Sequence, residues 1–329
     1  MTKAITFAGW GGHNQEAQAR HWLEPFTRET GIQVRQETLS GYDELKEQVD
    51  AGQTRWDVLV VGANFALQRD AAWLERLDDR VWQRTDLLPG LATPLRVPDL
   101  VYSIIIHWHR DRVPRPVTSW ADFYDPDGFP GKRVTYGVVQ YGLFESALMA
   151  DGVAPKDLYP LDLDRAFRVI DRLRDHLIFT KDLEEADTLL ANGEVAMALY
   201  SQNHAYLARH KSDRLAIMWK QQILLSEFLV VPRGAPNRAE AMQLIDYILD
   251  PEPQSRLSRD LTYSPINVHA TPDAEMAPHM TFTHRSPDDA VFDDEWWSIN
   301  QPEVERRFEE WKASRAPVRP DPPIRGARA

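Results

Sequence analysis

Hydrophobic and polar positions follow the periods of strands and helices along most of this chain. The first part of the sequence predicts strands at 4–8, 33–38 and 57–61, and helices at 17–30 and 43–52. Within the first helix, Trp22, Leu23 and Phe26 recur on one face, and Gly31 supplies a stop signal. Because strands and helices alternate, the pattern predicts a doubly wound α/β sheet with parallel strands.

The clearest pattern of all lies between residues 183 and 206. Leucines and alanines at helical spacing from Leu183 end at Asn192-Gly193, and the apolar run 195–199 then predicts a buried strand. Polarity changes abruptly after this run, where Tyr200 and Gln202 follow. Ligands of open α/β sheets bind at the carboxyl ends of strands, so both residues are candidate ligand contacts.

Other predicted strands end in similar polar or glycine-rich turns. Trp10 and His13 follow the first strand among three glycines, which permit a tight turn into a helix amino terminus. The candidates after the other strands are Gly62, Asn64, Gln140 and Tyr141. The glycine spacing matches neither nucleotide-binding fingerprint, so these turns predict a small-molecule site without a phosphate loop.

Composition narrows the classes of function. The chain has 329 residues, 43% of them hydrophobic, which is enough for about two domains with substantial cores. A net charge of −12 argues against nucleic-acid or anionic-membrane partners and leaves room for cationic ligands. The absence of cysteine excludes disulfides, thiolate metal sites and cysteine nucleophiles.

Two histidines raise the question of a metal site. His107 and His109 would share one face of the strand predicted over 101–106 and the residues after it, a spacing compatible with a metal pair. No third ligand lies nearby in the sequence, which favours a structural or cleft-wall role. We therefore expect neither a metal nor a cofactor.

Several motifs, in order, resemble one known family. They are the Trp-rich turn followed by Phe-Thr-Arg-Glu-Thr-Gly-Ile-Gln-Val, the Ser-Trp-Ala-Asp helix start at 119–122 with a later Gly-Lys turn, the run 193–199, and the stretch 237–267 with its Tyr-Ser-Pro-Ile-Asn turn. The chain is similar over 5–312 to the periplasmic solute-binding proteins of ABC importers, the family that includes the spermidine/putrescine receptors.

The resemblance implies two α/β lobes that are joined by a hinge and close on a ligand in the cleft between them. The implied lobes are 1–109 with 226–271, and 110–225 with 272–315, followed by a loose tail at 316–329. It also implies a monomeric receptor that delivers a small molecule to the transmembrane subunits of an ABC permease. The alternative from another functional class is an enzyme that uses Glu227 with His13 or His107 for general acid–base chemistry.

The resemblance also matches the family's ligand-contacting positions to residues of this sequence. They correspond to Trp10, His13, Gly62, Asn64, Tyr141, Tyr200, Glu227, Tyr263 and Trp297, whereas Gln140 and Gln202 come from the strand ends. Glu227 lies within a long apolar run, where an unpaired carboxylate is costly. It would contact a ligand amine or, alternatively, a hinge arginine or backbone amides.

The sequence departs from the polyamine receptors after the strand at 133–136. Those receptors have two acidic residues there, and this chain has Gln140 and Tyr141 but no carboxylate. A single remaining acid, Glu227, favours a compact monocationic or zwitterionic ligand over a polyamine. The alternative is an anionic, opine or sugar-derived ligand held by His13, Asn64 and helix amino termini.

The expected location is the periplasm, as for the family. The sequence begins Met-Thr-Lys and enters the first strand without the signal peptide of an exported receptor, so the cytoplasm is the alternative if this start is native. No apolar run reaches the roughly 20 residues that cross a bilayer.

Overall fold

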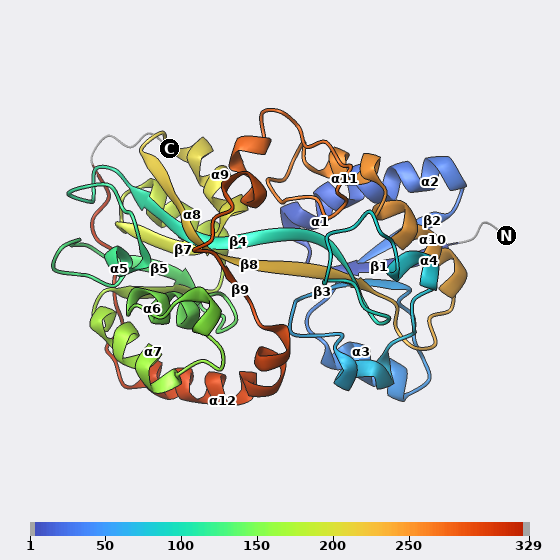
Figure 1. Ribbon diagram of the computed structural model, residues 1–329, viewed down its shortest axis with the longest axis horizontal. Helices are drawn as coiled ribbons and strands as arrows, with labels where there is room; N and C mark the ends of the chain where they lie inside the picture. The colour runs from blue at the N-terminus through green and yellow to red at the C-terminus, as the bar shows by residue number, and fades with distance from the viewer. Residues whose placement is uncertain (1–3, 325–329) are drawn as a thin grey trace. The chain divides into compact units, whose positions relative to one another are not determined.

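The computed structural model describes residues 4–324, which form two compact units (Figure 1). Unit 1 contains the chain up to residue 101 and residues 226–278; unit 2 contains residues 102–225 and the chain from 279 onward. Sequence analysis placed these crossings near residues 109, 225 and 271. Two long strands, β4 (Val97–His109) and β8 (Leu215–Val230), pass through crossings without interruption, so hydrophobic patterning does not mark where the units meet.

Unit 1 is built on parallel strands joined to the end of β8. β1 (Ala4–Gly9) lies between β2 (Gln33–Thr38) and β3 (Val58–Val61), and it is parallel to both. β3 pairs in turn with the carboxyl end of β8. This pairing is antiparallel, with Leu59 opposite Val230. The carboxyl ends of β1 and β3 therefore lie at one edge of the sheet, which confirms the α/β class predicted for this part of the chain.

Helices cover both faces of the unit 1 strands. Figure 1 shows α1, α2 and α11 on one side and α3 on the other. The helical segments are α1 (Gly12–Gln18), the π-helical η1 (Ala19–Leu23), α2 (Glu24–Thr30), α3 (Asp43–Asp50), η2 (Gln68–Trp73), α4 (Asp79–Trp82), α10 (Arg238–Ile248) and α11 (Pro251–Leu257). Trp22 is fully buried and its indole N–H donates to the carbonyl of Pro253 at 3.0 Å, which fixes η1 against α11.

Unit 2 is likewise built on parallel strands that pair with one long antiparallel strand. The remainder of β4 pairs antiparallel with β7 (Met197–Ser201), and β5 (Arg133–Tyr136) lies parallel between β7 and β6 (Leu177–Thr180). The short β9 (Ala290–Val291) pairs with β8. The mixed α/β class thus holds for this unit as well.

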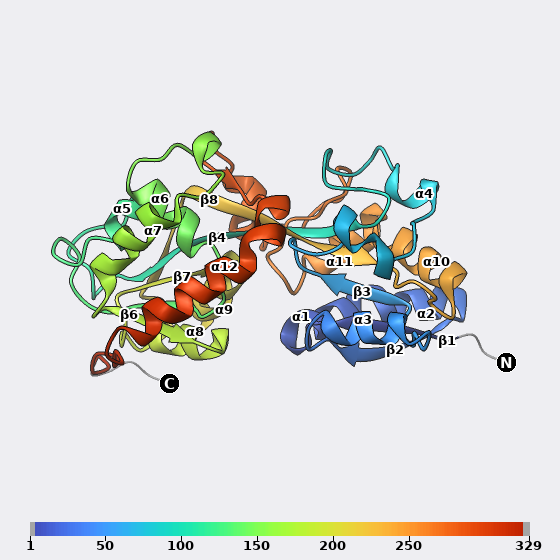
Figure 2. The same cartoon turned by 90° about the horizontal axis from the view of Figure 1, so that it is seen from below.

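The helices of unit 2 lie on opposite faces of its strands. Figure 2 shows α12 crossing the strands on one face, and Figure 1 shows α8 and α9 on the other. The helical segments are α5 (Trp120–Phe123), α6 (Leu143–Ala150), η3 (Pro155–Asp157), α7 (Leu163–Ile170), η4 (Asp171–Leu173), α8 (Leu183–Ala191), α9 (Gln202–Lys211), η6 (Thr281–His284) and α12 (Asp294–Ala313), with η5 (Ala277–His279) at the boundary. Phe308 of α12 packs edge-on against Phe144 of α6 and Phe179 of β6.

Three local features are decided by the structure. The last helix begins at Asp294, because the Asp293 carboxylate accepts from the backbone N–H of Trp296 and caps it there. The buried helix α6 was not anticipated, since an apolar helix has no polar face to give it a period. Residues 316–324 of the expected loose tail form no helix or strand, but the backbone N–H groups of Asp321 and Ile324 donate to the loop after α8, and residues 325–329 lie outside the described part of the chain.

Candidate functional site

The carboxyl end of β1 leads into an aromatic cluster in unit 1. Trp10 directly follows β1, is 39% exposed, and meets the ring of Tyr42 edge-on with centroids 6.0 Å apart. Tyr42 stacks in turn on Phe65, with centroids 4.1 Å apart and planes inclined by 14°. Gly11 and Gly12 both have positive φ, which lets the chain turn sharply after Trp10 and begin α1. The cluster offers aromatic faces and edges to a ligand.

The turn after β3 is fixed by the same tyrosine. The Gly62 N–H donates to the Tyr42 hydroxyl at 2.8 Å, and a Cβ atom at Gly62 would lie 3.3 Å from that oxygen. Burial raises the pKa of Tyr42, and the nearby charge of Glu227 raises it further. Tyr42 therefore stays a neutral phenol. Asn64, two residues after Gly62, is partly exposed at the same turn.

Arg96 stabilises the turn that follows β3. Its Nη1 donates to the carbonyls of Ala63 at 2.7 Å and Phe65 at 3.0 Å, and its guanidinium lies 3.8 Å from the centre of the Phe228 ring. Phe228 directly follows Glu227 in β8. Sequence reasoning missed Arg96 and Tyr42. The signal for Arg96 was a lone cation directly before a long apolar strand.

Two acidic side chains of unit 1 lie close together. Glu227 on β8 is partly accessible, whereas Asp99 on β4 is 0% exposed. Burial raises the pKa of Glu227 to about 7, and both burial and the charge of Glu227 raise the pKa of Asp99. Among residues 4–324, Glu227 has no hydrogen bond or ion pair, whereas the backbone N–H groups of Asp99 and Leu100 lower the pKa of Asp99. The pairing of Glu227 with a hinge arginine, left open by the sequence, is therefore not found.

The remaining predicted residues of unit 1 lie around α1. His13 is exposed in the first turn of this helix. The side-chain amide of Asn14 donates to the Tyr263 hydroxyl at 3.0 Å, and Tyr263 is 8% exposed. Unit 1 thus brings Tyr263 beside α1, the helix that begins just after Trp10.

The candidates of unit 2 are divided between its surface and its core. Gln140 and Tyr141 follow β5 and are partly exposed, with Tyr141 edge-on to Tyr136 at 5.2 Å. Gln202 is fully buried and accepts from the backbone N–H of Ser103 at 2.9 Å. Tyr200 is also fully buried, in the core cluster beneath α8 and α9. The polar residues after β7 therefore begin α9 and lie partly inside the unit.

Trp297 occupies the core on the other face of unit 2. It is 0% exposed, stacks on Phe292 with centroids 5.5 Å apart, and donates its indole N–H to the Glu145 carboxylate at 2.6 Å. The Tyr159 hydroxyl donates to the same carboxylate oxygen at 2.6 Å. These contacts join α12 to α6 and account for the burial of Glu145.

The two histidines of β4 have protein partners. Burial lowers the pKa of His107 to about 3, and its Nε2 lies 3.2 Å from the carbonyl of Tyr200. The Nδ1 of His109 accepts from the backbone N–H of Asp111 at 3.2 Å. No group of three or more potential metal ligands occurs within residues 4–324. The histidines serve the strand pairing and the turn that follows it.

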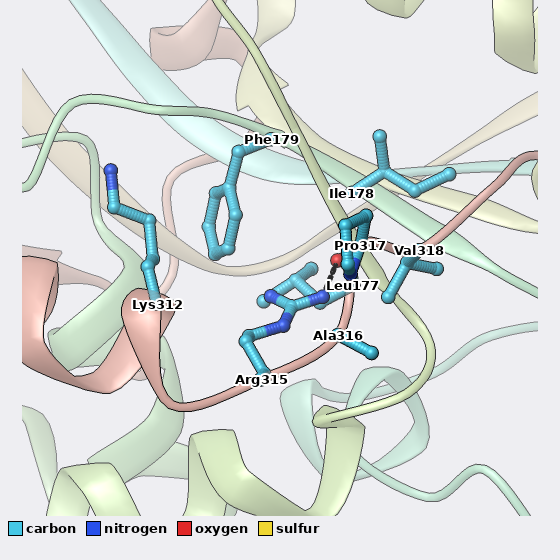
Figure 3. Close-up of a pocket in the computed structure, with 8 residues that line it drawn as sticks. All are labelled: Leu177, Ile178, Phe179, Lys312, Arg315, Ala316, Pro317 and Val318. Atoms are coloured by element: carbon cyan, nitrogen blue, oxygen red, sulfur yellow. Dashed lines mark hydrogen bonds between the residues drawn. The ribbon is translucent and has the colours of Figure 1, made fainter.

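A cavity in unit 2 lies away from all of these candidates. It has a volume of about 290 Å³ and is bounded by β6 and the segment after α12 (Figure 3). The Arg315 guanidinium points toward β6 and donates to the carbonyl of Leu177, while Phe179 and Lys312 form another wall. No residue predicted to contact ligand lines this cavity.

Comparisons with known proteins agree with the resemblance stated above. The family described as bacterial extracellular solute-binding protein matches residues 21–282. The gamma-aminobutyric acid (GABA)-binding protein of Pseudomonas aeruginosa is 29% identical over 324 residues, which cover 95% of this chain and 92% of that protein. The spermidine/putrescine-binding periplasmic protein of Escherichia coli is 24% identical over 264 residues, covering 75% and 74%.

Solved structures show the same similarity in three dimensions. The Atu4243-GABA receptor superposes with a TM-score of 0.90 at 32% identity, covering 95% of this chain and 99% of that one. The binding protein AgtB of A. tumefaciens R10, in complex with agropinic acid, gives a TM-score of 0.81 at 30% identity with the same coverage. The sequence-based recognition is confirmed: this chain belongs to the bacterial extracellular solute-binding proteins.

Proposed function

We propose that this protein captures a small amine-bearing solute, specifically a zwitterionic amino acid of the GABA type, and delivers it to an ABC permease. Glu227 carries this proposal. It is a partly accessible carboxyl group in unit 1 with no hydrogen bond or ion pair in residues 4–324. A buried carboxylate without a partner is costly, and a ligand ammonium would remove that cost.

The surroundings of Glu227 also suit a short amine. The charge of Glu227 acts on Tyr42, which belongs to the aromatic cluster of Trp10, Tyr42 and Phe65. Aromatic faces and edges favour the methylene groups and the cationic end of an aliphatic amine. Two similar proteins are named for GABA, and their similarity extends over 95% of this chain.

The proposed mechanism is capture by population shift. A ligand that binds one conformation of the protein better than another shifts the population toward that conformation. We propose Gln140 and Tyr141 in unit 2 as further ligand contacts, because they follow β5 and remain partly exposed. The permease would then recognise the liganded form. The proposed location is the periplasm, and within residues 4–324 no helix has the length and apolar character needed to cross a membrane.

Thermal unfolding with a panel of solutes tests the ligand class. GABA at 100 times its Kd should stabilise the protein by about 2.7 kcal/mol, seen as a higher Tm. Putrescine should give a smaller shift, because its second ammonium lacks a carboxylate. Mass spectrometry should recover GABA intact, as expected of a receptor that is not an enzyme. A shift with putrescine but not with GABA would contradict the proposal.

An opine is the second candidate, because AgtB holds agropinic acid and is 30% identical to this chain. Agropinic acid belongs in the same panel. If agropinic acid stabilises the protein and GABA does not, the proposed ligand class becomes the opines.

Two tryptophan substitutions should separate ligand contact from core packing. Trp10→Phe should weaken GABA binding severalfold with little change in the free energy of unfolding, because Trp10 is 39% exposed. Trp297→Phe should lower the free energy of unfolding by about 1–3 kcal/mol, because Glu145 loses a buried donor. Calorimetry and urea unfolding of both variants provide the comparison. Weaker binding by a stable Trp297→Phe variant would instead place Trp297 at the ligand.

A further inference from the structure

The Tyr42 hydroxyl carries a proton that the protein itself does not use. Its oxygen accepts from the Gly62 N–H at 2.8 Å, and within residues 4–324 this side chain makes no other hydrogen bond. By contrast, the Tyr124 hydroxyl of unit 2 donates its proton to the carbonyl of Leu143 at 2.9 Å. The acceptor for the Tyr42 proton therefore comes from outside the protein, either water or a ligand that replaces it.

The position of this hydroxyl is fixed by contacts on several sides. The Tyr42 ring stacks on Phe65 with centroids 4.1 Å apart, and it meets the ring of Trp10 edge-on at 6.0 Å. A Cβ atom at position 62 would lie 3.3 Å from the hydroxyl oxygen, so glycine permits the close approach of the tyrosine. Trp10 follows β1 and Gly62 follows β3, which places the hydroxyl between the carboxyl ends of these two strands.

The chemistry of the hydroxyl suits an anionic acceptor. Burial raises the pKa of Tyr42, so the phenol keeps its proton at neutral pH. The N–H bond that it accepts from Gly62 polarises the phenol and strengthens it as a donor. An O–H group that donates to an ionised carboxylate forms a short, charge-assisted hydrogen bond of about 2.5–2.7 Å. Tyr42 and Gly62 each retain some exposed surface, which a ligand can contact.

We propose that the Tyr42 hydroxyl donates to the carboxylate of the bound solute and thereby selects zwitterionic amino acids over simple amines. This inference rests on the proposed function, in which Glu227 accepts from the ammonium at the other end of the solute. The charge of Glu227 acts on Tyr42, so both side chains belong to one part of unit 1. An amine with a methyl group in place of the carboxylate loses the bond to Tyr42. The second ammonium of putrescine would meet a donor there instead of an acceptor.

Tyr42→Phe tests this inference, because phenylalanine keeps the ring contacts with Phe65 and Trp10 and removes only the hydroxyl. Calorimetry at pH 7.5 with GABA and with butylamine, which has a methyl group in place of the carboxylate, gives two Kd values for each protein. The variant should bind GABA about tenfold more weakly, as expected for a lost hydrogen bond to a charged group, and butylamine within about twofold of wild type. A general disturbance of the turn at Gly62 would instead weaken both ligands equally.

Infrared difference spectroscopy reports on the same contact without depending on affinity. With GABA labelled with ¹³C at its carboxylate and bound at saturation, the carboxylate stretching band should differ between wild type and Tyr42→Phe. Wild type should also prefer GABA to butylamine by about tenfold or more, a comparison that needs no variant. Identical bands in the two proteins, equal weakening of both ligands, or equal affinity of wild type for both ligands would overturn the inference.

Tyr159→Phe is the matched control, because it removes a hydroxyl that donates to the buried Glu145 carboxylate in unit 2. It should lower the Tm but keep the wild-type ratio of the two Kd values and the wild-type carboxylate band. The two proposals fail in different ways. If GABA does not bind wild type, the proposed function fails and takes this inference with it. If GABA binds wild type and Tyr42→Phe equally well, only the role of the Tyr42 hydroxyl is refuted.

Discussion

Glu227→Gln should reduce the affinity for GABA by about thirtyfold or more at pH 7.5. Glutamine keeps the size of the side chain but removes its charge, so the ligand ammonium loses its ionised acceptor in a mostly desolvated site. Truncating one partner of a buried charge pair costs roughly 2–5 kcal/mol, and each 1.4 kcal/mol corresponds to a factor of ten in Kd. Isothermal titration calorimetry measures the change.

Loss of binding must be separated from loss of folding. Glu227 has no partner in residues 4–324, so its neutralisation removes an unpaired buried charge without taking an acceptor from any protein donor. The empty variant should therefore be at least as stable as wild type in urea at pH 7.5. Unchanged affinity in a folded Glu227→Gln protein would remove Glu227 from the site and leave the proposed amine ligand without its acceptor.

The largest effect on stability is expected from Arg133→Met, which should lower the free energy of unfolding by about 3–5 kcal/mol. Arg133 is fully buried at the start of β5, and burial lowers its pKa to about 10. Its guanidinium donates to the carbonyls of Phe123 at 3.0 Å, Gly131 at 2.6 Å, Asp125 at 3.2 Å and Phe129 at 2.5 Å. Methionine fills similar space but donates to none of these oxygens, and each unsatisfied buried acceptor costs about 1–3 kcal/mol.

Arg165→Met is a suitable control for this measurement. Arg165 also makes several hydrogen bonds, to the Asp151 carboxylate at 2.7 Å and to its backbone carbonyl at 2.6 Å, but its side chain is 35% exposed. Water can replace those bonds, so the expected loss is about 1 kcal/mol or less. Urea unfolding followed by tryptophan fluorescence compares the two variants. Equal losses would show that the enclosed carbonyls beside Arg133 are hydrated rather than dependent on it.

Strands with a regular pattern were predicted closely from the sequence, and those with a continuous apolar pattern were not. The predicted bounds of β2 and β5 agree with the structure, because glycine or polar turns flank both. β4 extends well beyond the predicted segment 101–106, since Pro98 does not interrupt the strand, and β8 likewise continues through Glu227. The apolar helix α6 was missed for the same reason.

Burial separates the predicted aromatic residues in a way that sequence position does not. Trp10 lies between glycines, Tyr200 and Trp297 each precede a serine, and all three were predicted to contact ligand. The structure leaves Trp10 exposed after β1 but encloses Tyr200 beneath α8 and α9, and Trp297 against Phe292. A strand end is open or covered according to the helices that pack on it, and those helices come from distant parts of the chain.

Asp99 shows what the sequence contained but did not reveal. It lies in an apolar strand just as Glu227 does, yet only Glu227 corresponded to a place known from the family. Their interaction depends on bringing β4 and β8, far apart in the sequence, into neighbouring positions of the sheet.

By itself the sequence determined the α/β class, the family and one acidic ligand candidate, because periodicity and local motifs report burial within a single element. Only the tertiary structure decided which aromatic residues stay exposed, which carbonyls Arg133 must satisfy, and that the acidic candidate has a second carboxyl group beside it. These properties depend on the dielectric surroundings and on contacts between distant segments, which no local pattern records.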